Sequence, residues 1–156
     1  MVGKVFTYPT RLLAFGNREW TCAATIERCL RQFKVPGLLI HGTAKGADSI
    51  AAAVGLRLGW TILPFVADWS EYQRTKGASG SNAGTLRNTR MLVEGHPTIG
   101  LGFGLMRRPD PKRAGKFKAT GSADMAAQLA DAGVRVTIVG RPDGYSRPTE
   151  ASLLQL

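Results

Sequence analysis

Cysteine, histidine and long apolar runs are scarce in this sequence, and each shortage excludes a class of protein. The two cysteines, Cys22 and Cys29, lie on one predicted helix, where a rise of about 1.5 Å per residue separates their Cα atoms too widely for a disulfide. We therefore expect both cysteines to pack as small apolar side chains in a protein of a reducing compartment. Two histidines and two separated cysteines form no recognisable set of metal ligands, so we expect neither a metal nor another cofactor.

No stretch of the chain reaches the roughly 18 apolar residues of a membrane span, and its first residues lack the apolar core of a signal peptide. We therefore expect a cytoplasmic protein with no membrane partner. The length of 156 residues fits one domain, residues 1–156, with a core over about 11–140. Residues 141–156 contain proline and are expected to form a loosely held tail.

Acidic residues are also few, since 21 Lys and Arg face 11 Asp and Glu and leave a net charge of +10. Clustered cations favour polyanions because binding releases counterions from phosphates. The basic residues gather between 107 and 118, where prolines and turn residues indicate a flexible loop over about 106–119. This loop fits either a solvated segment or a flap over phosphates or nucleic acid. The nucleic-acid candidates are Lys112, Arg113, Lys116 and Lys118.

Short apolar runs alternate with helical periodicity along the chain. Alternation with short turns predicts a parallel sheet with helices on both faces, because right-handed crossovers place them there. We therefore expect an α/β fold, a Rossmann-like three-layer sandwich of about five strands in the order 3-2-1-4-5. The predicted strands are 11–15, 38–40, 60–65, 98–104 and 134–139, and the predicted helices are 21–33, 48–58, 85–94 and 122–132.

Two of the predicted strands end in a glycine-containing turn that leads directly into a helix. The first run, RLLAF, continues into GNREW at 16–20, and the second, GLLIH, continues into GTAKGAD at 42–48. Such turns gather backbone N–H groups at a helix start, where the helix dipole also favours an anion. Two of them side by side predict a phosphate or nucleotide site. Its candidates here are Gly16, Asn17, Arg18, Gly42, Thr43, Gly46 and Asp48.

Some of these residues have a plainer interpretation. Asp48 at a helix start is typical of a helix cap, which stabilises by about 1 kcal/mol without any ligand. Lys45 is expected to point to solvent, and His41 fits a satisfied residue at a strand end. Arg18 suits bidentate contact with phosphate oxygens but also fits an exposed turn residue.

Two further pairs of residues belong to the predicted site. Asp68 and Trp69 follow the third strand, where the indole can stack on a base and the carboxylate can accept from a ribose hydroxyl, although Trp69 also fits core packing. Arg87 and Asn88 open a helix after a glycine. Because helix starts prefer acidic residues unless an anion is nearby, these two favour contact with phosphate or sugar.

The motifs resemble, in order, the signature of the YspA-like SLOG family, over about residues 11–140. The resemblance implies a Rossmann-like fold that binds nucleotides or nucleotide-derived ligands, in a family common in bacterial and phage genomes and in a superfamily whose members often form homodimers. It adds Gly121 and Ser122, in a last glycine turn, to the residues expected in one pocket. The matching stretches are GNREW, HGTAKGAD, ADW, AGTLRN with Met91, and TGSADM at 120–125.

The resemblance extends to enzymes of the wider superfamily, the cytokinin-activating phosphoribohydrolases. They release a base from a nucleoside monophosphate with an arginine in R-K-x-x-M and a glutamate in G-G-x-G-T-x-x-E. This sequence keeps Arg87 and Met91, but Met125 stands where the glutamate would be, with Asp124 one residue earlier. One helical residue rotates a side chain by about 100°, so Asp124 is no automatic substitute. N-glycosidic cleavage stays open, with Arg87 and Asp124 as candidate catalytic residues.

A second resemblance, to the DNA-processing protein A family, covers residues 42–51 and 59–62. Those proteins bind single-stranded DNA, and the net charge of +10 suits that partner. Single-strand binders stack bases on aromatic side chains along a basic groove, whereas this chain has only three Trp, three Tyr and six Phe. The sequence therefore favours a nucleotide-ligand sensor or enzyme over a single-stranded DNA-binding protein, and leaves an interaction protein with a relict pocket as a third interpretation.

Overall fold

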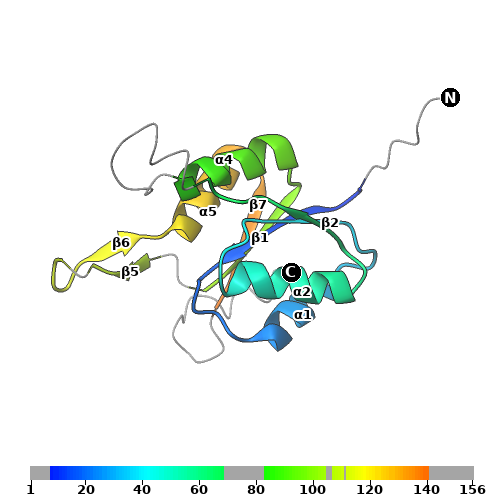
Figure 1. Cartoon of the computed structure of the whole chain (residues 1–156), viewed down its shortest axis with the longest axis horizontal. Helices are drawn as coiled ribbons and strands as arrows, with labels where there is room; N and C mark the ends of the chain where they lie inside the picture. Colours follow the sequence, from blue (N-terminus) through cyan, green and yellow to red (C-terminus); the bar gives the residue numbers. More distant parts are fainter. Residues whose placement is uncertain (1–7, 69–82, 105–106, 111, 141–156) are drawn as a thin grey trace.

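The computed structural model describes residues 8–68, 83–104, 107–110 and 112–140. Five strands form one parallel sheet in the order β3-β2-β1-β4-β7 (Figure 1). This confirms the predicted Rossmann-like α/β fold, because the fifth strand of the expected order 3-2-1-4-5 is β7. The strands are β1 (Arg11–Gly16), β2 (Leu38–His41), β3 (Thr61–Pro64), β4 (Ile99–Phe103) and β7 (Arg135–Val139).

Helices cover both faces of this sheet (Figure 1). Helices α1 (Ala23–Leu30) and α2 (Ala47–Arg57) contact each other on one face, and α4 (Ala83–Gly95) and α5 (Gly121–Asp131) contact each other on the opposite face. Strand β1 lies at the centre, with β2 and β3 on one side and β4 and β7 on the other. The chain reverses its winding direction at β1, and in open α/β sheets that place is where ligands bind.

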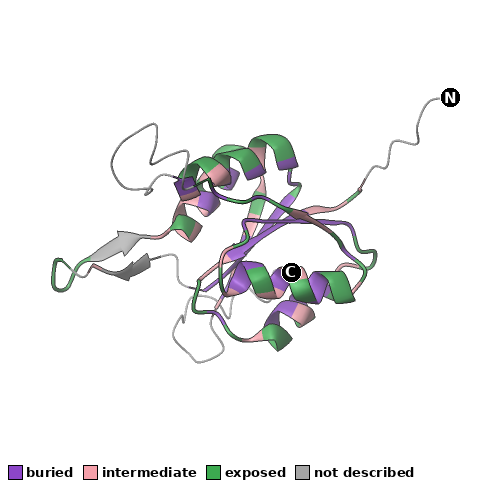
Figure 2. Cartoon of the chain, viewed as in Figure 1, coloured by how far each residue is buried: buried purple, intermediate pink, exposed green. Residues whose placement is uncertain are grey.

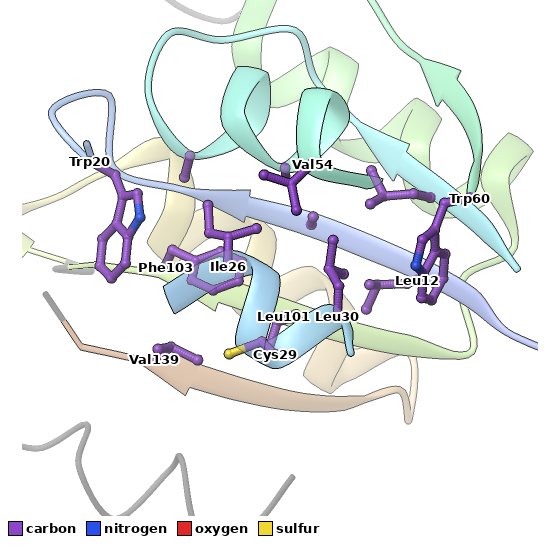
Figure 3. Close-up of a cluster of buried hydrophobic side chains, with 14 of the residues drawn as sticks. Leu12, Trp20, Ile26, Cys29, Leu30, Val54, Trp60, Leu101, Phe103 and Val139 are labelled. Atoms are coloured by element: carbon purple, nitrogen blue, oxygen red, sulfur yellow. The ribbon is translucent and has the colours of Figure 1, made fainter. Parts of the chain in front are cut away.

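Alternate residues of β1 supply two separate cores, one on each face of the sheet. Leu12 and Ala14 join the cluster under α1 and α2, whereas Leu13 and Phe15 join the cluster under α4 and α5. The continuous apolar run of β1 is therefore buried on both faces, as expected of a central parallel strand (Figure 2). In the first cluster Trp20 packs against Phe103 with ring centroids 5.5 Å apart (Figure 3).

The two cysteines also lie in or against this first cluster. Cys29 is fully buried in the cluster that Figure 3 shows, and Cys22 packs against the same cluster. Both are free thiols, and burial raises the pKa of Cys29 to about 11, so this residue behaves as an apolar one. Helix α1 begins at Ala23 with Cys22 as its N-cap residue, slightly later than the start expected at Thr21.

The basic segment expected as a flexible loop contains a hairpin. Strands β5 (Arg107–Pro109) and β6 (Phe117–Ala119) pair antiparallel between β4 and α5 and project from the main body (Figure 1). Backbone bonds close the connection, from Asp110 N to Lys116 O at 2.8 Å and from Lys116 N to Arg113 O at 3.1 Å. The turn residues that indicated a loop serve to reverse the chain between two short strands.

Among the described residues, no helix has the length and apolar character needed to cross a membrane. The predicted tail at 141–156 and most of the segment between β3 and α4, including Trp69, lie outside the described residues.

Candidate phosphate site

The turns that follow β1 and β2 pack against each other at the carboxyl edge of the sheet. The N–H group of Ala47 donates to the carbonyl oxygen of Asn17 at 3.1 Å, which ties the start of α2 to the first turn. Gly46 has a φ of +76°, and a Cβ atom there would overlap the carbonyl oxygens of Arg18 and Asn17. The contact between the two turns therefore requires glycine at position 46.

Gly16 and Asn17 lie in the first turn, where protein atoms fill the space beside Gly16 and accept or donate the hydrogen bonds of Asn17. A Cβ atom on Gly16 would overlap the carbonyl oxygen of Phe103, so this glycine permits close packing rather than the approach of a ligand. The backbone N–H of Asn17 donates to Phe103 O at 2.7 Å, and its side-chain oxygen accepts from Glu19 N at 2.8 Å. The predicted opening at Gly16 is therefore filled.

Asp48 does not cap its helix, contrary to the plainer expectation. The N-cap residue of α2 is Gly46, and no side chain caps that end. The Asp48 carboxylate instead points back and accepts from the N–H of Gly42 at 2.9 Å, while the backbone N–H groups of Ala44 and Gly16 lower its pKa. The residue is only 3% exposed. The Gly42 N–H thus competes successfully with the N–H groups of the helix in which Asp48 lies.

Burial governs the electrostatics of Asp48. Loss of solvent raises the pKa of its carboxyl to about 6, against the opposing effects of the Gly42 N–H and the positive charge of Arg87. The neighbouring His41 is also buried, and burial together with the Arg87 charge lowers its pKa. Its Nδ1 atom accepts from the N–H of Thr43 at 3.2 Å, as a neutral imidazole can.

Arg87 reaches this turn from the second turn of α4. Its Nη1 donates to the carbonyl oxygen of Gly42 at 2.7 Å, and its Nη2 makes a long contact of 3.5 Å with Asn88 Oδ1. Its Nε is buried and has no hydrogen-bond partner among the described residues. Burial lowers the pKa of Arg87, the Asp48 charge raises it and the Arg18 charge lowers it further. Among the ion pairs of the described residues, none includes Arg87.

A cavity of about 260 Å³ opens above this turn. Three cationic side chains line it, Arg18, Lys45 and Arg87, and none of its described lining residues is acidic. Lys45 was expected to face solvent, and it is exposed but borders the cavity. Thr43, two residues earlier, has a φ of +59°, a conformation that few residues other than glycine adopt. The remaining described lining residues are Gly42, Thr43, Ala44, Val66 and Ala67.

Asn88 is not among the described lining residues of this cavity and links α4 to α5. Its Nδ2 donates to Gly121 O at 3.1 Å and to Asp124 Oδ2 at 2.9 Å, and only 3% of the residue is exposed. Gln128 Nε2 donates to the same Asp124 oxygen at 2.9 Å. These bonds bring the last glycine turn beside Asn88, but they use the polar atoms that were expected to contact a ligand. Gly121, Ser122 and Asp124 are not among the described lining residues.

The other predicted residues lie at the margin or beyond the described part. Asp68 is exposed and directly follows Ala67 at the rim of the cavity, whereas Trp69 is outside the described residues. On the hairpin connection Lys112, Arg113 and Lys116 are exposed, and Arg113 Nε donates to Asp110 Oδ2 at 3.1 Å. The side chain of Lys118 is not described. Within the described ranges, no cluster of His, Cys, Asp and Glu is arranged to hold a metal ion.

Four residues that line the cavity are not among the predicted site residues, and their place in the fold, rather than their residue type, explains why they lie there. Ala44 and Lys45 lie inside the second glycine turn, and Val66 and Ala67 follow β3 after Phe65. The rule that ligands bind beyond the carboxyl ends of parallel strands would have pointed to both pairs.

Comparison with known proteins supports the resemblance seen in the motifs. A model of the family described as YspA, cpYpsA-related SLOG matches residues 10–72, a stretch that holds both glycine turns, the second of which lies between β2 and α2. The similarity to this family is thereby confirmed over these residues. No curated protein matches the sequence.

Among solved structures, the X-ray structure of DNA processing protein A from Streptococcus pneumoniae is similar to this chain. The TM-score is 0.61 at 15% sequence identity, and the alignment covers 95% of this chain and 56% of that chain. At this identity the likeness shows the fold, and this chain spans little more than half the length of that protein.

Proposed function

We propose that this protein binds a nucleotide or nucleotide-derived ligand at the carboxyl edge of its sheet, as a sensor or a nucleotide-processing enzyme. The ligand phosphate would lie between Arg18, Lys45 and Arg87. The observation that carries the proposal is the state of Arg87: its guanidinium is half-buried beside a cavity in which no described lining residue is acidic, and of the two hydrogen bonds that its side chain makes to described residues one is as long as 3.5 Å. A guanidinium has more N–H donors than these bonds use.

The charge and size of the cavity favour a phosphate. Like charges of Arg18, Lys45 and Arg87 around one cavity repel each other, and an anion between them relieves that repulsion. A planar guanidinium also binds phosphate oxygens in pairs. The volume of about 260 Å³ lies below the roughly 300 Å³ of a typical small-molecule pocket, so the cavity suits the phosphate while the rest of the ligand extends beyond it.

The experiment is calorimetric titration with a panel of nucleosides and their mono- and diphosphates. We expect phosphorylated members to bind and Arg87→Ala to weaken them about 10- to 150-fold, the loss of a charge-assisted contact of about 1.5–3 kcal/mol. Arg90→Ala is the matched control, because Arg90 is an exposed arginine on the same helix that pairs with Glu94. It should change affinity less than about twofold.

Two results would contradict the proposal. Equal affinity in Arg87→Ala and wild type would remove the site, and a panel without any binder would remove the function. Circular dichroism of each variant is the control that tests whether loss of the Gly42 contact has unfolded the protein.

The same panel separates a binder from an N-glycosidase. If Arg87 and Asp124 cleave a nucleoside monophosphate, chromatography should detect free base, and Asp124→Asn should abolish its release with little change in affinity, because the carboxylate would stabilise an oxocarbenium-like charge. Asp124 accepts hydrogen bonds from Asn88 and Gln128 and is absent from the described lining of the cavity, which favours binding without cleavage.

Single-stranded DNA is the second candidate partner. The observation in its favour is the basic hairpin connection, where Lys112, Arg113 and Lys116 are all exposed. The fold of DNA processing protein A is consistent with this partner, although the likeness by itself carries no function. Its test is the salt dependence of DNA binding described below.

A further inference from the structure

We infer that Asp48 is a positioning residue of the phosphate site: its carboxylate fills the cluster of N–H groups formed by the two glycine turns and, through Gly42, holds Arg87 in place for the anion of the ligand. The part of this inference that concerns the ligand rests on the function proposed above. The part that concerns the turns does not, because it follows from contacts within the protein.

The first step is that an anion already occupies the backbone donors. Successive N–H groups in turns of this kind form a concave site that binds anions in many proteins. Here the N–H of Gly42 donates to the Asp48 carboxylate, which is only 3% exposed, and the backbone N–H groups of Ala44 and Gly16 also favour its charged form. The Gly42 N–H is therefore already occupied, and a ligand phosphate would be bound by the cationic side chains above this turn.

The second step is that Gly42 connects this internal anion to Arg87. The N–H of Gly42 donates to Asp48 at 2.9 Å, and its carbonyl oxygen accepts from Arg87 Nη1 at 2.7 Å. A Cβ atom on Gly42 would lie 2.7 Å from Arg87 Nε and 3.0 Å from Asp48 Oδ2. The glycine is thus packed between carboxylate and guanidinium, and a shift of one is transmitted to the other.

The sign of one mutational effect separates positioning from a purely electrostatic influence. Coulomb's law alone says that removing a negative charge beside a phosphate site tightens the binding of an anion. A positioning role says the opposite, because Asp48→Asn replaces the charged acceptor of the Gly42 N–H by a weaker neutral one and loosens the turn that orients Arg87. We expect Asp48→Asn to bind the phosphorylated ligand of the panel at least about tenfold more weakly at pH 7.5.

A double variant tests whether Asp48 acts through Arg87. If it does, Asp48→Asn combined with Arg87→Ala should bind no more weakly than Arg87→Ala alone, because the orienting contact has no further target. The control is Asp131→Asn, which removes an exposed carboxylate at the end of α5 and should leave affinity unchanged. Tighter binding in Asp48→Asn, or losses that add in the double variant, would overturn the inference.

A rescue experiment tests the internal anion without any nucleotide. Asp48→Ala leaves the N–H cluster empty, so formate at about 100 mM should enter it and raise the melting temperature by about 3 °C more than it does for wild type or Asp131→Ala. If Asp48→Ala does not fold without formate, recovery of the native circular dichroism spectrum on adding formate is the readout. Equal responses of variant and wild type would overturn the inference. Rescue together with a panel that contains no binder would leave Asp48 as the organiser of the turns and remove only the proposed ligand.

Discussion

The chain concentrates positive charge in two places, the cavity between the glycine turns and the tip of the β5–β6 hairpin, and builds them differently. In the cavity Arg87 is half-buried, bonds to the Gly42 carbonyl and has a buried carboxylate beneath the same turn. At the hairpin tip the cations are exposed, and Arg113 pairs with Asp110 at 3.1 Å. Both regions contribute to the same net charge of +10.

The difference teaches that burial and hydrogen bonding, rather than the number of charges, give a cation a specific task. Exposed charges are screened by salt within about 10 Å, and an exposed ion pair contributes at most about 1 kcal/mol. A half-buried guanidinium is less screened and cannot move freely, so it favours an anion at one defined position. We therefore expect substitutions at the cavity to have large, local effects and those at the hairpin to have small, salt-dependent ones.

The largest contrast should come from one glycine in each region. Gly46 and Gly115 have nearly the same φ, +76° and +73°, but a Cβ atom at Gly46 overlaps backbone carbonyl oxygens whereas one at Gly115 meets nothing within 4 Å. Gly115→Ala should cost about 1 kcal/mol for its left-handed conformation. Gly46→Ala adds an overlap that only a backbone shift can relieve, and should cost about 3 kcal/mol or more. Urea denaturation measures both, and equal costs would contradict the packed contact between the turns.

The sequence predicts the frame of the cavity well because that frame depends on local patterns. Continuous apolar runs predict central parallel strands, and the run from Leu12 to Phe15 is buried on both faces. Strand ends with glycine turns predict where backbones meet, and Ala47 does bond to Asn17. The order of the strands follows because right-handed crossovers allow few arrangements of alternating strands and helices.

The roles of single polar residues depend on partners distant in the chain, which local patterns do not contain. An aspartate at a helix start predicts a cap, but the Asp48 carboxylate accepts from the N–H of Gly42, whose carbonyl oxygen accepts from Arg87 of α4. The sequence predicts that Asn88 contacts a ligand, but its side-chain amide donates to Gly121 and Asp124 of α5. The hairpin was missed for another reason: each of its strands spans three residues, too few for any periodicity.

The next contrast is the pH dependence of stability, which should follow the buried carboxylate. The pKa of Asp48 rises from 3.8 to about 6 on folding, so the folded state binds its proton more tightly than the unfolded chain does. The stability that this provides is present below about pH 3.8 and is lost as pH rises through about 6. The full difference is on the order of 3 kcal/mol. Arg87 is the charged group that acts on Asp48, and the nearby His41 has a lowered pKa, so its contribution to stability rises with pH instead.

Comparing wild type with Asp48→Asn cancels the contribution of His41. Between pH 4.5 and 7.5, the difference in unfolding free energy between the two proteins should change in favour of Asp48→Asn by about 2 kcal/mol. The exposed control Asp131→Asn should run nearly parallel to wild type across the same range. Parallel curves for Asp48→Asn would mean that this carboxylate is not buried as the contacts show.

The smallest effect on the fold, and the sharpest test of the second partner, comes from the hairpin. Replacing Lys112, Arg113, Lys116 and Lys118 by alanine should change the unfolding free energy by less than about 1 kcal/mol. Lys112, Arg113 and Lys116 are exposed, and the ion pair of Arg113 lies at the surface.

If the hairpin binds single-stranded DNA, each phosphate contact contributes a slope of about 0.7 log units of affinity per log unit of salt, and the variant should lose up to about 3 units of that slope. Arg87→Ala, one charge in the cavity, should change the slope by no more than about 0.7. Nucleotide affinity should fall in Arg87→Ala and change little in the hairpin variant, because screening by salt acts on the exposed tip far more than on the half-buried guanidinium. An unchanged slope in the hairpin variant would remove this surface as the DNA contact. A hairpin variant that loses nucleotide affinity as strongly as Arg87→Ala would show instead that the two cationic regions act on one ligand.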